Sequence, residues 1–235
     1  MEYFTKTSQY VLHADSKKYV DDDTIMSIVI DDITYTLISS YYIVGVNDPF
    51  DSCADVENKV INCSIQRQIN GLPVRKIGHS AFRFHKALQS VYIPNTINEL
   101  GYDCFGYIPT LIDVQFEENF DHPLTFSQGV FVNATNLKTI QIPATSILNL
   151  MYVFYHTNLD MLLFCGIDDI NKYSFINAPK NILLNRYYKG NTFGGLSTIS
   201  KVLACDTHVY KSKNNIFCIY RSNLIFSYIY VYILL

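Results

Sequence analysis

Histidine and cysteine are the side chains that most often carry chemistry, and both are scattered thinly through this chain of 235 residues. The six histidines are His13, His79, His85, His122, His156 and His208. No two of them stand four residues apart, so the helical spacing that would hold a zinc ion is missing. His79 follows a glycine and His85 lies in a linker, so we expect both to be surface or turn residues.

Cys205 and His208 have the one spacing that suggests a thiol–imidazole pair. A catalytic pair also needs a third group that orients the imidazole, and the irregular segment around these two residues offers none. The six cysteines include no C-x-x-C pair of the kind that binds zinc; they are Cys53, Cys63, Cys104, Cys165, Cys205 and Cys218. We interpret most of them as small apolar residues of the core.

The remaining motifs also argue against an enzyme. The acidic triplet from Asp21 to Asp23 lacks the spaced ligands and the glycine of a calcium loop, so we expect a solvated edge or turn. Gly194 and Gly195 are followed by neither a lysine nor a helix start, which excludes a phosphate loop. No serine-nucleophile motif and no pair of catalytic carboxylates is recognisable. The sequence therefore predicts no catalytic residue, no cofactor and no metal.

Composition narrows the class of partner. The net charge is −3 and 49% of the residues are apolar, so a packed core is expected and a nucleic-acid partner is not. The charge is uneven: residues 1–200 carry 14 basic and 20 acidic side chains, whereas residues 201–235 carry 4 and 1. The last 35 residues are thus a different kind of sequence from the rest.

An internal repeat predicts the strands that would position a functional site. The frame apolar-x-x-apolar-x-apolar, which is typical of a leucine-rich-repeat strand, recurs along the chain. Its copies begin at Val60, Leu88, Leu111, Leu137, Leu159 and Pro179. Cys63 occupies an apolar position of the first copy, and Pro94 and Pro143 end their strands because proline cannot donate to a ladder.

A set of phenylalanines repeats with nearly the same period: Phe82, Phe105, Phe131, Phe154 and Phe175. A single repeat of this length cannot bury its own apolar side, so stacked repeats should place these rings in one column of a shared core. Cys104 shares the position of Ala81 next to that column and should also be buried. Gly78 and Gly101, four residues before a ring, are expected to allow a tight turn.

These landmarks carry a resemblance to a known family. Residues 69–82, 88–94 and 97–101 together resemble the BspA-type leucine-rich-repeat family, whose 23-residue repeats occur in bacterial surface antigens and in parasitic protists. The resemblance covers residues 58–175 well and 176–200 loosely, and residues 187–195 resemble the closing segment of such arrays. It implies an α/β, strand-rich, right-handed repeat solenoid with a role in adhesion or protein binding, and no active site.

We divide the chain into four parts. Residues 1–23 are polar and expected to be partly disordered, and residues 24–57 form an N-terminal β-hairpin cap. Within the cap, a hairpin turns at Asp31 and Asp32, and a further strand covers 41–46. Residues 58–200 form the leucine-rich-repeat solenoid, and residues 201–235 form an atypical apolar tail.

The tail from 216 to 235 has three interpretations. It could anchor the chain in a membrane, although the charge-free run after Arg221 is shorter than the roughly 20 residues that a span needs. It could be a strand-like extension that packs on the last repeat. It could also be an artefact of the gene model, because it abandons the repeat abruptly.

The binding surface is predicted from strand alternation, which points every second side chain away from the core. The predicted protein-binding face consists of Gln89, Ser90, Tyr92, Ile112, Asp113, Gln115, Lys138, Thr139, Gln141, Asp160 and Met161. The same alternation adds Ile61, Asn62, Ser64, Leu163, Lys180, Asn181 and Leu183. Amides and apolar groups with few charges suit a protein partner, and the alternative is an ordinary solvated sheet face.

Location within the cell has two interpretations. The family resemblance indicates the cell surface, in which case the sequons at Asn62 and Asn133 could be glycosylated. The N-terminus lacks the hydrophobic run of a signal peptide, which indicates instead a cytoplasmic scaffold protein with no adhesive role. The partner is a protein in either case.

Overall fold

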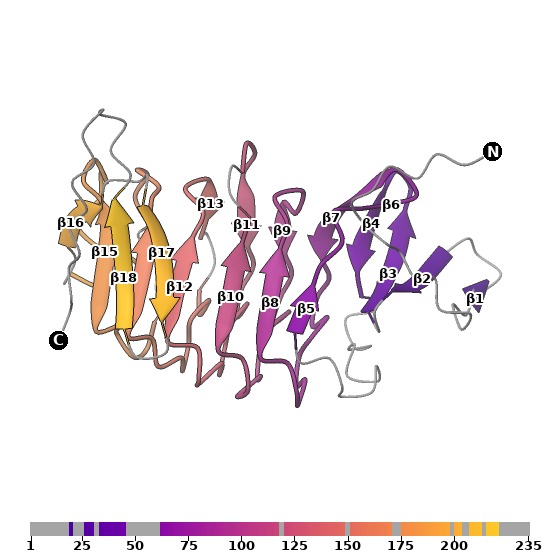
Figure 1. Ribbon diagram of the computed structural model, residues 1–235, viewed down its shortest axis with the longest axis horizontal. Coiled ribbons are helices and arrows are strands. Elements are labelled where there is room, and N and C mark those ends of the chain that lie inside the picture. The colour runs from indigo at the N-terminus through magenta and orange to yellow at the C-terminus, as the bar shows by residue number, and fades with distance from the viewer. Residues whose placement is uncertain are drawn as a thin grey trace.

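The computed structural model describes residues 19–20, 26–30, 33–45, 62–117, 120–148, 151–170, 175–197, 200–203, 207–212 and 215–220. All regular elements within these ranges are β-strands, and the repeats follow one another along the long axis of the molecule (Figure 1). The expected α/β class is therefore wrong for this part of the chain, which is strand-rich and without helices.

The first sheet joins the N-terminal strands to the repeats. Its order is β1-β2-β3-β4-β7-β9-β11-β13, with β6 paired to β7. β2 and β3 are antiparallel with Ile30 opposite Ile33, whereas β4 runs parallel to β7. The bounds are β1 Tyr19–Val20, β2 Met26–Ile30, β3 Ile33–Ile38, β4 Tyr41–Val44, β6 Gln68–Ile69, β7 Leu72–Ile77, β9 Glu99–Leu100, β11 Leu124–Phe126 and β13 Ser146–Ile147.

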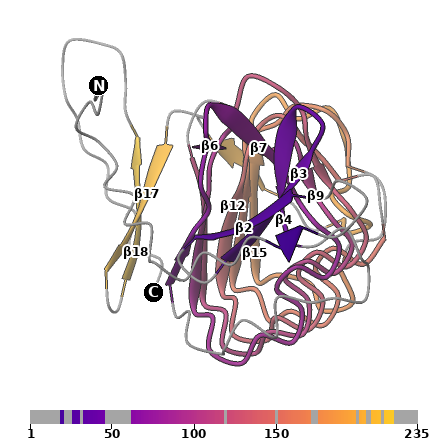
Figure 2. The same cartoon turned by 90° about the vertical axis from the view of Figure 1, so that its right-hand side faces the viewer.

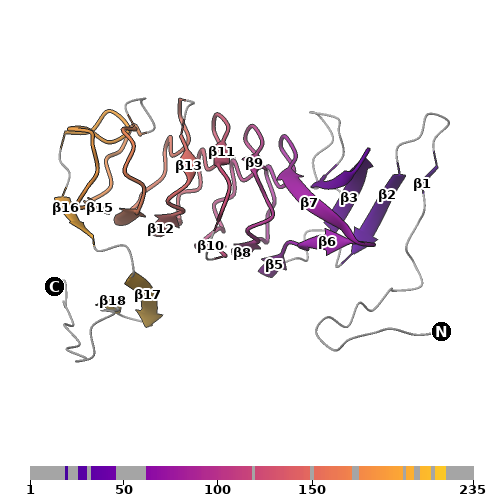
Figure 3. The ribbon, with the colours of Figure 1, turned by 90° about the horizontal axis from the view of Figure 1, so that it is seen from above.

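A second row of strands comes from the apolar frame, and all six copies of that frame contain a strand. The row consists of two parallel sheets, β10-β8-β5 and β12-β14-β15-β16. Seen from above, it forms one side of the molecule (Figure 3). The bounds are β5 Asn62–Ser64, β8 Ser90–Ile93, β10 Asp113–Phe116, β12 Thr139–Ile142, β14 Met161–Phe164, β15 Asn181–Asn185 and β16 Ser200–Leu203.

The segments between the two rows are chains of tight turns, which explains the missing helices. In the turn of residues 78–85, the Arg83 N–H donates to the Ser80 carbonyl at 3.0 Å, a three-residue step. The Phe82 N–H donates instead to the Cys104 carbonyl of the next repeat at 2.8 Å. Backbone donors that alternate between the turn and the neighbouring repeat cannot form the four-residue ladder of an α-helix.

Left-handed residues interrupt these turns at two fixed positions. They are Ser80 and Phe84, Asp103 and Tyr107, Gly129 and Asn133, and Tyr152 and His156. A left-handed residue does not occur inside a right-handed helix, so each pair limits its segment to turns. We call the segments 78–85, 101–108, 127–134 and 151–157 the turn edge.

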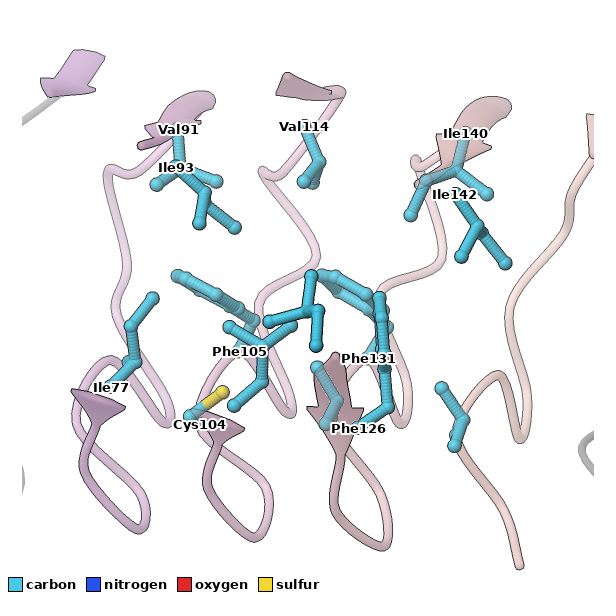
Figure 4. Packing of buried hydrophobic residues seen from close by; sticks show 14 of the residues in the cluster. Ile77, Val91, Ile93, Cys104, Phe105, Val114, Phe126, Phe131, Ile140 and Ile142 are labelled. Carbon is cyan, nitrogen blue, oxygen red and sulfur yellow. The ribbon is translucent and has the colours of Figure 1, made fainter. Parts of the chain in front are cut away.

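The phenylalanine column is present as predicted (Figure 4). Successive rings from Phe82 to Phe175 stack with centroids 5.2, 5.7, 5.7 and 5.3 Å apart and with planes within 13° of parallel. Val91, Ile93 and their equivalents on the next strands pack against this column. Cys63 and Cys104 are 4% and 0% exposed, so their predicted core positions are confirmed.

Gly101 has a different role from the one expected. Its φ is not among the positive values, so no left-handed turn requires glycine there. A Cβ on Gly101 would instead lie 2.7 Å from the backbone carbon of Gly78. The glycine allows two neighbouring repeats to approach closely.

Several predictions concern residues outside the described ranges. These are the segment 1–18, the acidic triplet, the turn at residues 31–32, Ile61, Cys53, Cys205 and the tail after residue 220. Residues 207–212 and 215–220 are described as the antiparallel pair β17 (Thr207–Ser212) and β18 (Asn215–Tyr220).

Candidate protein-binding surfaces

The outward side of the second strand row contains most of the predicted binding residues. The exposed ones are Gln89, Tyr92, Ile112, Gln115, Lys138 and Gln141, while Ser90, Asp113 and Asp160 are half-buried. The parallel register places Tyr92 between Ser64 of β5 and Gln115 of β10. We call the outward residues of β5, β8, β10 and β12, together with Gln89, Ile112 and Lys138 just before these strands, the strand face.

Two residues of the prediction are wrong as surface residues. Thr139 is 6% exposed and Met161 is 3% exposed. Leu163, which the alternation also placed outward, is 1% exposed. The alternation of side chains along a strand correctly predicts the face of the sheet on which a residue lies. It does not predict whether another segment of the chain covers that face.

Polar side chains on the strand face are linked to one another. The Ser90 hydroxyl donates to Oδ1 of Asn62 at 2.6 Å, and Nε2 of Gln115 donates to Oδ2 of Asp113 at 2.6 Å. Further along the row, Asp160 and Lys180 form an ion pair at 2.8 Å. The charges are few and of both signs, which does not suit a polyanion.

Exposed apolar side chains also lie on this face. Ile112 is 51% exposed and Tyr92 is 36% exposed. The Ile112 N–H donates to the Gln89 carbonyl at 2.9 Å, which places Ile112 beside the strand that carries Tyr92. A tyrosine and an isoleucine among amides and few charges resemble the composition of the centre of a protein interface.

The turn edge holds a second group of exposed residues, which the sequence did not reveal. Phe84 is 52%, Tyr102 48%, Met151 48% and Tyr152 39% exposed. The aromatic rings are paired across repeats, His79 with Tyr102 at 4.8 Å between centroids and Phe84 with Tyr107 at 4.9 Å. These residues precede or follow the buried phenylalanines by two or three positions, a pattern that could have identified them.

Arg83 joins the Phe84–Tyr107 pair. Its guanidinium carbon lies 4.6 Å from the Phe84 centroid and 4.8 Å from the Tyr107 centroid, within the range of cation–π attraction. Its Nε lies 3.7 Å from a carboxylate oxygen of Asp103. Burial raises the pKa of Asp103, and the Arg83 charge acts in the opposite direction.

The histidines of the turn edge support the backbone. His85 lies in the turn of residues 78–85 as predicted, but its side chain is 2% exposed, so the surface alternative is wrong. Its Nδ1 accepts hydrogen bonds from the N–H groups of Ala87 and Leu88, at 3.2 and 3.0 Å. Nδ1 of His79 accepts from the Tyr102 N–H at 2.9 Å.

The pKa values of titratable groups near the core are shifted mainly by burial of these groups. Burial lowers the pKa of His85, and burial followed by the charge of Lys76 lowers the pKa of His79. Burial raises the pKa of the Cys104 thiol well above its ordinary value, which disfavours a reactive thiolate. In the last repeat, burial raises the pKa of Tyr188 to about 12. The Tyr188 hydroxyl accepts from the Ile170 N–H at 2.7 Å.

In the part of the chain that the structure describes, no helix has the length and hydropathy needed to cross a membrane.

Solved structures provide similar chains of low identity. A leucine-rich repeat protein from Bacteroides capillosus is 21% identical, with 59% of this chain and 97% of that chain covered and a TM-score of 0.48. The pneumococcal vaccine antigen PcpA is 13% identical, with coverages of 82% and 53% and a TM-score of 0.45. A leucine-rich cell surface protein from Faecalibacterium prausnitzii is 15% identical, with coverages of 85% and 60% and a TM-score of 0.41. The chain thus spans only about half the length of PcpA.

Among curated proteins, no sequence matches the chain. The family comparison is positive: the model of the BspA type leucine rich repeat region matches residues 50–182 in six copies, which is more than half of the chain. The stacked phenylalanines and the first five copies of the strand frame lie within that range, and the sixth copy begins in it. The protein therefore belongs to the BspA-type leucine-rich-repeat family.

Proposed function

We propose that this protein is a non-catalytic interaction module that binds a protein partner through the strand face. The observation that carries the proposal is the exposure of Tyr92 and Ile112 among neutral polar side chains. Tyrosine supplies a large contact area with few rotamers to immobilise, and it is enriched among the residues that dominate binding energy. The surrounding amides can form hydrogen bonds at the edge of the contact.

The proposal includes the architecture that the family resemblance implies. The repeats form a right-handed solenoid, and residues 24–57 cap its N-terminal end. The pairing of β4 with β7 supports a cap, because it continues the first sheet beyond the first repeat. A capped end would leave the sides of the array as the surfaces for a partner.

The favoured setting is the cell surface, with a role in adhesion. The alternative is an intracellular scaffold. Asn62 is exposed, so glycan attached to Asn62 or Asn133 in protein from the native cell would support export. A cytosolic pool without glycan would support the scaffold.

Photo-crosslinking from the strand face tests the main proposal. The full chain would carry a photoreactive phenylalanine at position 92 and, as a matched control, at position 187. Tyr187 is 74% exposed and lies outside the strand face. Candidate partners are proteins from the native source that crosslink to position 92 and not to position 187.

A substitution then decides whether such a contact matters. Tyr92→Ala should weaken binding of the crosslinked protein by roughly 2 kcal/mol, or about 30-fold, if Tyr92 is a central interface residue. Tyr187→Ala should leave the affinity unchanged. An equal affinity for both variants and the unaltered chain would disprove the proposal.

The turn edge is a second candidate surface. Phe84, Tyr107, Tyr152 and His156 have left-handed backbones, although bulky residues rarely adopt that conformation. Strain of this kind is concentrated at functional sites. If the partner binds there, Tyr102→Ala should weaken binding whereas Tyr92→Ala should not.

A further inference from the structure

On the outward side of β14 both Met161 and Leu163 are buried, whereas β12 buries Thr139 but leaves Gln141 exposed. Met161 and Leu163 alternate along the strand with Leu162 and Phe164, which belong to the main core. The outward residues should therefore be accessible, as Tyr92 and Gln141 are on β8 and β12. Instead, Met161 is 3% and Leu163 is 1% exposed.

These two residues form a hydrophobic cluster that is separate from the main core. Cys165 and Leu183, both half-buried, pack against them. Because side chains at alternate strand positions lie on opposite faces of a sheet, this cluster lies on the opposite side from the phenylalanine column. Burial to a few per cent on that side requires a second layer of chain over β14 and β15.

The hairpin of β17 and β18 lies on that side. In Figure 1 it crosses in front of the second strand row, over β12 and β15. Figure 2, turned by 90°, and Figure 3, from above, both place it beside the outward side of that row, away from the first sheet. The sequence of β18 is apolar from Ile216 to Ile219, and the two strands pair over six positions from Thr207↔Tyr220 to Ser212↔Asn215.

We propose that residues 207–220 are an intramolecular ligand of the outer face of β14 and β15. The hairpin removes Met161, Leu163 and Leu183 from solvent, and it fills the position that a bound protein would occupy. This assigns the apolar sequence of β18 to the molecule's own surface, as a second layer on the last repeats.

The consequence for binding rests on the proposed function. While the hairpin is bound, a partner cannot reach Met161 or Leu163, and its access to the outer face of β15 is limited to the exposed end at Asn181. Displacement of the hairpin would extend the binding surface by the apolar side chains of β14 and β15. The hairpin would therefore restrict the length of the surface that a partner contacts.

The rate of methionine oxidation tests whether the hairpin shields Met161, and the experiment needs no binding partner. Met151 is 48% exposed and serves as the internal control for Met161 in the same molecule. With hydrogen peroxide and peptide mass spectrometry on the full chain, Met161 should oxidise roughly tenfold or more slowly than Met151, because peroxide reaches it only when the hairpin opens. This slow rate should not change on dilution.

The decisive variant is the full-length chain in which a glycine–serine segment of equal length replaces 207–220. Met161 should then oxidise at about the rate of Met151, while the amide of Leu162, which faces the core, keeps its slow hydrogen exchange. If this replacement does not fold, Tyr210→Pro and Tyr210→Phe form a matched pair. Hydrogen-bonded pairs alternate from Ser212↔Asn215, so position 210 donates within the ladder: proline there removes that donor, whereas phenylalanine keeps it.

Three outcomes would overturn the proposal. Met161 could react as fast as Met151 in the unaltered chain, which would show an open face. It could stay protected after the hairpin is replaced, which would show a different cover. It could lose protection on dilution, which would identify a second copy of the chain as the cover. Failure of the Tyr92 experiments would leave these results unaffected.

Discussion

At the scale of single residues, the stacked phenylalanines link the repeats to one another. Phe105, Phe131 and Phe154 each stack on the rings before and after them, so each of these rings is shared between two repeat interfaces. Phe84 lies two residues after Phe82 but is 52% exposed. Residues of the same type, two positions apart, therefore have opposite environments.

Phe105→Ala should lower the free energy of unfolding by about 3–5 kcal/mol, because it leaves a cavity between Phe82 and Phe131. Phe84→Ala is the matched control and should change it by less than about 1 kcal/mol. Urea unfolding followed by circular dichroism measures both. Similar small losses for the two variants would show that the column is not the core.

The histidines predict a pH dependence of stability. Burial lowers the folded-state pKa of His85 below its ordinary value of 6.5. Between these two pKa values the unfolded chain binds more protons than the folded chain, so stability decreases as the pH falls below about 6.5. Protonated Nδ1 could not accept from the N–H groups of Ala87 and Leu88.

The unfolding midpoint in urea should therefore be lower at pH 5 than at pH 7.5. His85→Gln should be less stable at pH 7.5 and should show a smaller decrease between the two pH values. His79→Gln should reduce the dependence further, because the pKa of His79 is also lowered. His156→Gln changes an exposed histidine and serves as the control. If the unfolding midpoint of His85→Gln fell between pH 7.5 and pH 5 as much as that of the unaltered chain, His85 would not be the cause of the pH dependence.

At the scale of elements, close approach between repeats determines where glycine is required. A Cβ at Gly101 would lie 2.7 Å from backbone atoms of Gly78 and His79, whereas a Cβ at Gly71 would meet nothing within 4 Å. Gly71, with φ of +81°, needs glycine only for its conformation. Substitution of Gly101 therefore tests the effect of a steric clash between repeats, and substitution of Gly71 tests the effect of backbone strain.

Gly71→Ala should therefore destabilise the protein by roughly 1–2 kcal/mol, the strain of a left-handed alanine. Gly101→Ala should destabilise it more, because two repeats must move apart or distort. Differential scanning calorimetry of both variants measures the order. A smaller effect at Gly101 than at Gly71 would show that the repeats can separate without loss.

At the scale of the whole molecule, the two rows of strands differ in continuity. The first sheet runs unbroken from β1 to β13. Within the described residues, the second row is divided, since no ladder joins β10 to β12. The repeat from Leu111 to Leu137, which separates β10 from β12, is 26 residues long instead of 23. The break in the second row thus coincides with a longer repeat.

Hydrogen exchange should reveal the division. β14 pairs with strands on both sides, whereas β12 pairs only with β14. Amides of β14 should therefore exchange more slowly on average than those of β12, because more of them are bonded to neighbours. Equal protection in β10, β12 and β14 would indicate a continuous ladder in solution.

The repeat can be predicted from the sequence alone. The apolar frame recurs because each strand must face the core, and the phenylalanine period matches it because stacked repeats share that core. Both signals are local and periodic, so they identified six strands, the aromatic column and the buried Cys63 and Cys104. The turns that replace helices were not predicted, because the residues with left-handed backbones include Phe84 and Tyr152, which are atypical of that conformation.

Which outward residues are exposed depends on how the folded segments pack, and the sequence did not predict it. Met161, Leu163 and Gln141 all follow the same alternation, and only Gln141 is accessible. The difference depends on contacts between segments far apart in the chain, which no local pattern encodes. For the same reason the burial of His85 and the close approach of Gly78 and Gly101 became visible only when neighbouring repeats were packed together.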